Sequence, residues 1–190
     1  MDRNASEPGS AGAGPADILA FWREAGPERW FTQDDAFDAA CRARFLTVFE
    51  DAAAGRLAGC EDSAQGALAL VLLLDQMPRN IFRGSARVWA SDPLAREVAG
   101  RAIAHGFDRE VDSDLRTFFY LPFMHGEDLA SQDRSVALYE EKGRPENVAW
   151  ARHHRDIVAR FGRFPHRNAI LGRESTAEEL AYLEADGFAG

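Results

Sequence analysis

Apolar side chains recur at three- and four-residue spacing along most of the chain, which is the periodicity of helices with one buried face. The clearest case runs from Asp34 to Ala54, where the following positions share one side of a helix: Phe37, Ala40, Cys41, Phe45, Val48, Phe49 and Ala52. Gly55 follows as the expected left-handed residue beyond the helix end. The opposite face carries Asp38, which we expect to be exposed. No segment alternates β-branched and polar residues as a strand would, so the pattern predicts an all-α fold.

Breaker residues divide the chain into about seven or eight predicted helices. A helix from about Ser63 is apolar on nearly all sides, as a central helix is, and we expect it to end before Pro78. Further helices are predicted over these ranges: Asp92 to His105, Asp112 to Tyr120, Glu127 to Lys142 and Glu146 to Phe161. A Ser-Thr pair followed by two glutamates, within residues 175–179, is typical of a capping box that starts the last helix.

The length of 190 residues and the hydrophobic content of 46% are those of one domain with a buried core. Residues 1–14 are rich in Gly, Ala and Ser and lack the apolar stretch of a signal peptide, so we expect a disordered tail followed by a single helical domain over 15–190. The most apolar run, Ala67 to Leu74, is far shorter than the roughly 20 residues that span a bilayer. These features predict a cytoplasmic protein.

The net charge of -9 disfavours nucleic acid and anionic membranes as partners, because binding to phosphates needs a basic surface. Cys41 and Cys60 belong to no CxxC pair or secretory framework, so neither a disulfide nor a thiolate zinc site is predicted. The common glycine-rich nucleotide fingerprints and the GxSxG nucleophile motif are missing from the sequence. We therefore predict no cofactor, and the sequence identifies no nucleophile.

Three stretches combine polar and apolar residues at high density: LDQMPRNIFRG at 74–84, YLPFMHGEDLASQDRS at 120–135 and RFGRFPHRNAILGR at 160–173. Together with LAFWREAGPERWFTQDDAFD at 19–38, they resemble the bacterial family known as domain of unknown function 924, along nearly all of 17–183. That family is grouped with tetratricopeptide-like helical proteins, so the resemblance implies antiparallel helix pairs curving round a concave face. It implies no activity. The chain departs from the family pattern at Gly126, where a serine is usual that would cap the next helix or touch a ligand.

The first and third of these stretches place hydrogen-bond donors in turns after apolar helices. The donors are Arg79, Asn80, Arg163, His166, Arg167 and Asn168. Such side chains bind phosphate or carboxylate through charge-assisted hydrogen bonds, so two adjacent turns would form a site for a small anionic molecule or a peptide carboxylate. Residues 152–173 support this, because they hold six arginines against one carboxylate, Asp156. In the structural alternative, these arginines pair with Asp75, Glu127 and Asp156 and fasten loops to the core. We expect Asp75 to lie between the two turns.

His125, Glu127 and His154 form a second candidate group. Glu127 with either histidine could act as an acid-base pair, which makes an enzyme the second hypothesis. The imidazoles of His125, His154 and His166 could also bind a transition metal together. No HExxH pair puts two ligands on one helix face, however, so no metal site is predicted. His154 alternatively is a hydrogen-bonded core residue, because it lies on an apolar stripe. The third hypothesis is a protein-interaction module, which would expose apolar and aromatic side chains in a groove.

Overall fold

The computed structural model describes residues 13–186, so the predicted tail over 1–14 lies outside the described residues except for positions 13 and 14. The described part is helical with short connections and contains no strand, which confirms the all-α prediction. No helix within it is both long and apolar enough to cross a membrane. The longer helices are α1 (Pro15–Ala25), α3 (Asp35–Ala53), α4 (Ala64–Val71), α6 (Asp92–Ala104), α7 (Ser113–Met124), α8 (Leu129–Lys142), α9 (Pro145–Phe161) and α10 (Ala177–Asp186). The shorter helices α2 (Pro27–Trp30) and α5 (Met77–Ile81) lie between them.

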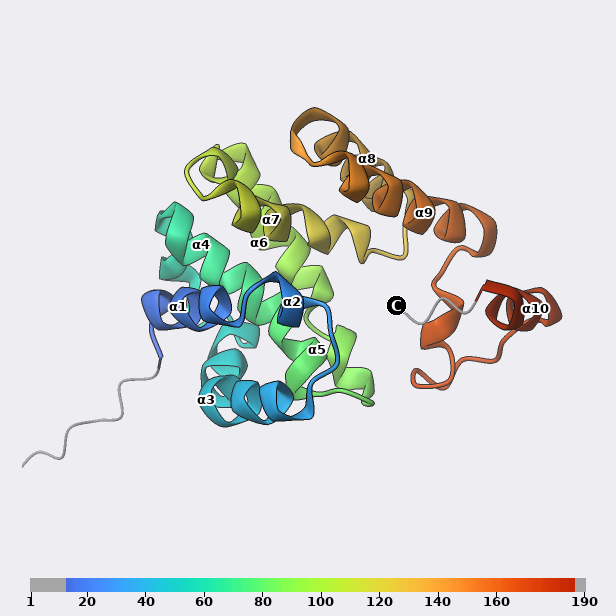
Figure 1. Ribbon diagram of the computed structural model, residues 1–190, viewed down its shortest axis with the longest axis horizontal. Coiled ribbons are helices and arrows are strands. Elements are labelled where there is room, and N and C mark those ends of the chain that lie inside the picture. Colours follow the sequence, from blue (N-terminus) through green and yellow to red (C-terminus); the bar gives the residue numbers. More distant parts are fainter. Residues whose placement is uncertain (1–12, 187–190) are drawn as a thin grey trace, which may run out of the picture.

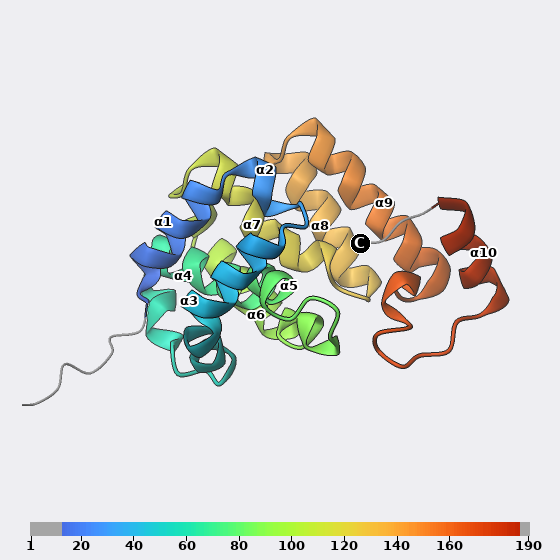
Figure 2. The same ribbon diagram turned by 60° about the horizontal axis from the view of Figure 1, so that its bottom comes forward.

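α1, α6 and α7 pack against α4, while α8 and α9 form a hairpin beside them and α10 lies at the far end of the molecule from α1 (Figure 1). Side chains of α1, α3, α4, α6, α7 and α8 bury one large apolar core, which includes Trp22, Phe45 and Phe118. A second, much smaller apolar cluster joins α9 to α10. Figure 2 shows these two helices near each other. The members of this cluster are Ile157, Val158 and Phe164, with Phe161 and Tyr182 packed against them. The segment that follows α9 is therefore attached to the rest by few apolar contacts.

The central helix does not end before Pro78, and that prediction was wrong. α4 passes into a π-helical turn, Leu72–Gln76, and then into α5, which has Pro78 in its first turn. Because proline has no N–H and its ring collides with the carbonyl four residues earlier, the wider π turn relieves the backbone here. The carbonyl of Leu74, which loses its usual donor, accepts a hydrogen bond of 2.6 Å from the Ser91 hydroxyl. The same turn carries Asp75 into the interior of the protein.

The other predicted helix boundaries are mostly confirmed. α3, α6, α8 and α9 begin and end within two residues of the prediction, whereas α7 continues through Pro122 to Met124 instead of stopping at Tyr120. The capping box of α10 is present: the Thr176 N–H donates to the Glu179 carboxylate at 2.8 Å, and the Glu179 N–H donates to the Thr176 hydroxyl at 3.2 Å. The start of α10 depends on local hydrogen bonds, which is why the sequence predicts it.

Asp38 is not the exposed residue that the helix pattern predicted. Its side chain keeps only 14% of its surface exposed. Its Oδ1 accepts hydrogen bonds from Asn80 at 2.8 Å and from Arg83 at 3.0 Å. α5 packs against α3, so Asn80 in α5 and Arg83 in the turn after it reach the polar face of α3. Asp38 is therefore covered by a tertiary contact that the helical periodicity does not predict.

Candidate functional site

A buried aspartate and a histidine form the centre of the candidate site. Asp75 is fully buried in the π turn, and its Oδ1 lies 2.7 Å from Nδ1 of His125, the residue that follows α7. Gln76 donates a hydrogen bond to the other oxygen. Burial raises the pKa of Asp75, but its interactions with His125 and Arg79 outweigh burial and hold that pKa below its ordinary range. The carboxylate is therefore ionised at neutral pH and can only accept hydrogen bonds.

The protonation of His125 follows from this pair. Burial and the nearby charge of Arg79 lower the pKa of His125, so the imidazole is neutral at pH 7. Its one ring proton must lie on Nδ1, which donates to Asp75, and its lone pair lies on Nε2. Nε2 makes no hydrogen bond within residues 13–186, and 14% of the side chain remains exposed. The lone pair is thus available to a molecule from solution.

Two side chains hold the turn that carries His125. The Nε2 of Gln132, buried on α8, donates to the carbonyls of Met124 and Gly126, each at 2.7 Å. Arg167 donates from Nη1 to the carbonyl of His125 at 3.2 Å. Each of three successive carbonyls therefore has a side-chain donor, which fixes the position of the imidazole. Sequence analysis missed Gln132, although a polar residue on the inward face of α8 was the signal that could have found it.

Two guanidinium groups flank the Asp75–His125 pair and share a different carboxylate, Asp92 at the start of α6. Arg79 donates to both oxygens of Asp92, at 3.2 and 3.3 Å, and Arg167 lies 3.9 Å from one of them. The first and third sequence stretches therefore meet. Asp75 was predicted to lie between the two turns; its carboxylate forms an ion pair with Arg79 at 3.8 Å, while its hydrogen bonds go to His125 and Gln76. We call Asp75, Arg79, Asp92, His125 and Arg167 the His125 corner.

Arg167 is the least satisfied member of the His125 corner. It lies in the short 3-10 helix η5 (Pro165–Arg167) and is only 6% exposed. Its guanidinium carbon lies 5.2 Å from the ring centroid of Trp89 and 4.6 Å from that of Phe164. Its Nε is buried without a hydrogen-bond partner among the described residues. Burial lowers the pKa of Arg167 to about 10, and Asp92 offsets this only in part. Buried donors without partners are rare in proteins, so this one points to a missing acceptor.

His154 and His166 lie beside the same corner. Burial, with the charge of Arg167, lowers the pKa of His166 to about 4. Burial also lowers the pKa of His154 to about 4, and His125 and His166 act on it in the same direction. The Nδ1 of His154 lies 2.8 Å from the Trp150 carbonyl. Three neutral imidazoles thus converge, yet within residues 13–186 no three His, Cys, Asp or Glu side chains are arranged to bind a metal ion.

Glu127, the predicted acid-base residue, is engaged elsewhere. Arg173 donates to its two oxygens at 2.7 and 3.0 Å, and the Phe164 N–H donates to it at 2.8 Å. Burial raises the pKa of Glu127, but these hydrogen bonds outweigh it and lower the pKa. No hydrogen bond between Glu127 and either His125 or His154 is present in the described part of the chain. Glu127 fastens the third stretch to the second, as the structural alternative proposed for it.

The remaining predicted site residues point away from the His125 corner. Arg163 donates to both oxygens of Glu179, at 2.7 and 2.8 Å. Asn168 donates to Ser175 at 3.0 Å and to Glu179 at 3.4 Å. Together with Thr176 these residues form a second polar network between η5 and α10, which we call the Glu179 corner. Asn80 lies on the opposite side of its helix and bonds to Asp38. The predicted set of donors is therefore divided among three places.

The departure at Gly126 has a local explanation. Asp128 caps α8, since its Oδ1 accepts a hydrogen bond of 2.7 Å from the Ser131 N–H. A Cβ on Gly126 would lie 2.7 Å from the Cβ of Ser131, so a serine here would require the start of α8 to shift. The capping role expected of a serine is thus already filled by Asp128.

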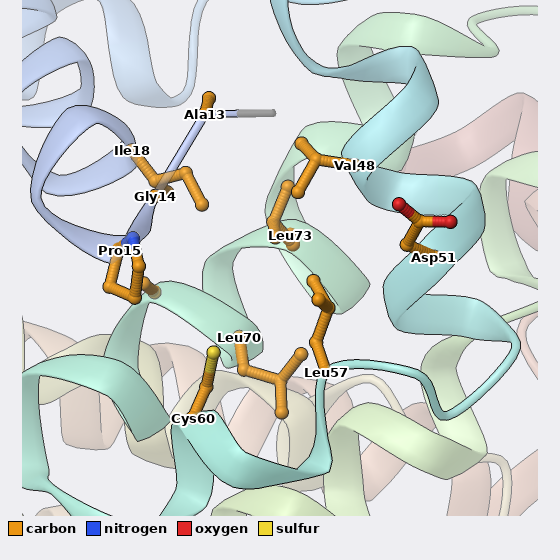
Figure 3. A pocket seen from close by; sticks show the side chains of 11 residues that line it. Ala13, Gly14, Pro15, Ile18, Val48, Asp51, Leu57, Cys60, Leu70 and Leu73 are labelled. Atoms are coloured by element: carbon orange, nitrogen blue, oxygen red, sulfur yellow. The ribbon is translucent and has the colours of Figure 1, made fainter. Parts of the chain in front are cut away.

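Two cavities among the described residues lie away from the His125 corner. One, of about 250 Å³, lies between α1, α3 and α4, and its walls are mainly apolar, with Ile18, Leu70 and Leu73 beside Cys60 and Asp51 (Figure 3). The other, also of about 250 Å³, is lined by residues of α3 and of the segment that leads into α6. The candidate site is therefore a polar cluster that reaches the surface at its rim.

Comparisons with known proteins agree with this fold. The profile of a family described as a bacterial protein of unknown function (DUF924) matches residues 18–187. The solved structure of a protein of unknown function, ATU0120 from Agrobacterium tumefaciens, is similar with a TM-score of 0.86 and 53% sequence identity, over 90% of this chain and 96% of that one. The comparison with curated proteins gave no match.

Proposed function

This chain belongs to the bacterial DUF924 family, whose function is unknown, and we propose that its His125 corner binds a small anionic molecule through a phosphate or carboxylate group. The observation that carries the proposal is Arg167, a buried guanidinium with a single hydrogen bond, at 3.2 Å, and a buried Nε that has no partner in the described residues. A buried cation is stabilised when its donors are satisfied, so an anion at this position gains charge-assisted hydrogen bonds.

The surroundings of Arg167 favour a small acceptor that approaches in the plane of the guanidinium. Trp89 and Phe164 lie against the guanidinium, and an acceptor bonds at the edge of the group, where its N–H bonds lie. Carboxylate and phosphate oxygens accept hydrogen bonds in that plane, often two at a time. Arg79 and His125 keep 23% and 14% of their side chains exposed, so the rim of the corner is open to solvent.

An enzyme is a second candidate, and the Asp75–His125 pair favours it. A buried carboxylate that accepts from Nδ1 leaves Nε2 oriented as a general base, which is how aspartate and histidine cooperate in many active sites. His125 replaces Glu127 as the candidate base, because Glu127 is held by Arg173. The interaction-module hypothesis has less support, since the exposed apolar side chains of the described residues come from five separate segments: Phe31, Leu129, Trp150, Ile170 and Leu180.

We also propose that the helices form a tetratricopeptide-like array and that the protein is cytoplasmic. The consecutive pairs α6–α7 and α8–α9 pack against each other, which supports a tetratricopeptide-like array of antiparallel helices. Cys41 and Cys60 are both free thiols, which supports the cytoplasm of a bacterium as the compartment.

A thermal-shift titration tests anion binding. We expect inorganic phosphate or acetate to raise the melting temperature of the wild-type protein, by an amount equivalent to about 2.7 kcal/mol at a concentration one hundred times the Kd. Arg167→Lys, which keeps the charge but loses the planar fork, should abolish most of the shift. Arg163→Lys in the Glu179 corner is the matched control and should retain it. No shift with wild-type protein, or equal shifts in the two variants, would refute the proposal.

A further inference from the structure

Anion binding at Arg167 does not use the lone pair on Nε2 of His125. We propose that Nε2 accepts a hydrogen bond from a hydroxyl group of the same molecule, so that the site selects small hydroxy acids over acids that lack the hydroxyl. This inference rests on the proposed function and adds the second group by which the ligand is recognised. Because Nε2 is an acceptor, the ligand group that bonds to it must be a donor.

The tautomer of His125 is set by three neighbours. The Nδ1–H of His125 donates a hydrogen bond to Asp75 at 2.7 Å, and Gln76 donates to the remaining oxygen of that carboxylate. Arg79 lies 3.8 Å from the same Oδ1 that His125 contacts, so a further positive charge on the imidazole would face a guanidinium. A neutral imidazole with its proton on Nδ1 offers no donor on its outer side. A carboxylate or phosphate oxygen therefore gains nothing at Nε2, whereas a hydroxyl does.

Arg167 places the two recognition groups a short distance apart. Its Nη1 holds the carbonyl of His125 itself, at 3.2 Å. The carbonyl oxygen and the far ring nitrogen of one histidine are separated by roughly 6 Å, from standard bond lengths. Nε2 therefore lies no more than roughly 9 Å from Nη1, a span that a small hydroxy acid can bridge with a hydrogen bond at each end. Gln132 keeps this spacing constant, because it fixes the carbonyls on both sides of His125.

The surrounding side chains are already committed to other partners. Asp92 accepts from Arg79, and Glu127 accepts from Arg173 and Phe164. Neither carboxylate bonds to Nε2, and 14% of the His125 side chain remains exposed. The ligand class that fits both groups is a small carboxylate or phosphate ester with a hydroxyl a few bonds from the anionic group.

Matched pairs of ligands test the inference by isothermal titration calorimetry. The pairs are glycolate with acetate and lactate with propionate, which differ mainly in one hydroxyl. We expect the hydroxylated member to bind roughly three- to tenfold more tightly, as one neutral hydrogen bond contributes. His125→Phe should bring both members to the affinity of the acid without the hydroxyl, while His105→Gln, at an exposed histidine, should leave the preference unchanged.

Nitrogen-15 NMR of the imidazoles gives a readout in the wild-type protein, which matters if His125→Phe fails to fold. We expect the His125 signals to show the proton on Nδ1, and the Nε2 signal to shift with glycolate but not with acetate. Equal affinities within each pair, or a proton on Nε2 in the free protein, would overturn the inference and leave anion binding intact. If neither member of a pair binds, both the inference and the proposed function fail.

Discussion

The His125 corner and the Glu179 corner each take an arginine from the stretch 160–173, yet the two arginines differ in how completely their hydrogen bonds are made. Arg163 has two hydrogen bonds to Glu179, at 2.7 and 2.8 Å, and a third to the carbonyl of Glu174 at 2.8 Å. Arg167, only four residues later, has one of 3.2 Å and a buried Nε that no described residue contacts. A cation with satisfied donors fastens two segments, whereas a buried cation with unused donors is a candidate for recognition.

The two corners also differ in what supports them. The His125 corner takes its side chains from the π-helical turn after α4, from α5, α6 and η5, and from the residue after α7, and the π-helical turn contributes to the large apolar core. The Glu179 corner joins η5 to α10, which are otherwise held by the small cluster around Phe164. A change in the first should therefore affect unfolding of the whole protein, and a change in the second should affect mainly the C-terminal helix.

The largest effect is expected from Asp75→Ala. Removing this fully buried carboxylate takes a counter-charge from Arg79 and the hydrogen-bond acceptor from His125, so the free energy of unfolding should fall by about 3 to 5 kcal/mol. Urea denaturation measures the change. Asp38→Ala is the comparison, because Asp38 is paired but lies nearer the surface, and should cost about 1 kcal/mol. Equal urea midpoints for the two variants would mean that Asp75 is not a buried partner.

A pH titration of stability should expose the histidines beside the His125 corner. His154 and His166 have pKa values of about 4 in the folded protein, below the ordinary value of about 6.5, because burial penalises the charged form. Between pH 6.5 and 4 the unfolded chain binds protons that the folded protein does not, so stability falls as the pH falls. The slope is at most about 1.4 kcal/mol per pH unit for each histidine.

His166→Gln isolates that contribution. The variant should lose part of the slope between pH 6.5 and 4 in urea midpoints, whereas His105→Gln, at an exposed position, should keep it. Identical slopes in the wild-type protein and in His166→Gln would show that this imidazole is not buried in its neutral form.

The smallest and most local effect is expected from Glu179→Gln. The amide keeps the shape of the side chain but loses the charge that holds Arg163 and part of the capping box. Hydrogen exchange of the α10 amides should accelerate about tenfold, while exchange in α4 stays unchanged. Faster exchange in both helices would mean that the two corners unfold together, and the contrast between them would not hold.

Sequence patterns were sufficient for the helices because the signals for helices are local. Apolar spacing located α3, and the Thr176–Glu179 capping box located the start of α10, since both depend on residues within a few positions of each other. The prolines led to wrong helix ends because a proline, too, is only a local signal. Pro78 normally ends a helix, but the chain continues because Ser91, from a distant segment, supplies the hydrogen bond that the Leu74 carbonyl needs.

Partner choice among the polar residues was decided only by the tertiary structure. The sequence indicated that Arg79, Arg163, Arg167 and the nearby histidines carry the polar chemistry, and it could not say which carboxylate each arginine meets. Arg163 and Arg167 differ in environment because one faces α10 and the other turns between Trp89 and Phe164 toward Asp92. Charge and hydrogen bonding act at contact distance. The tertiary arrangement therefore decides that Arg163 is paired with Glu179, whereas Arg167 keeps a buried donor without a partner among the described residues.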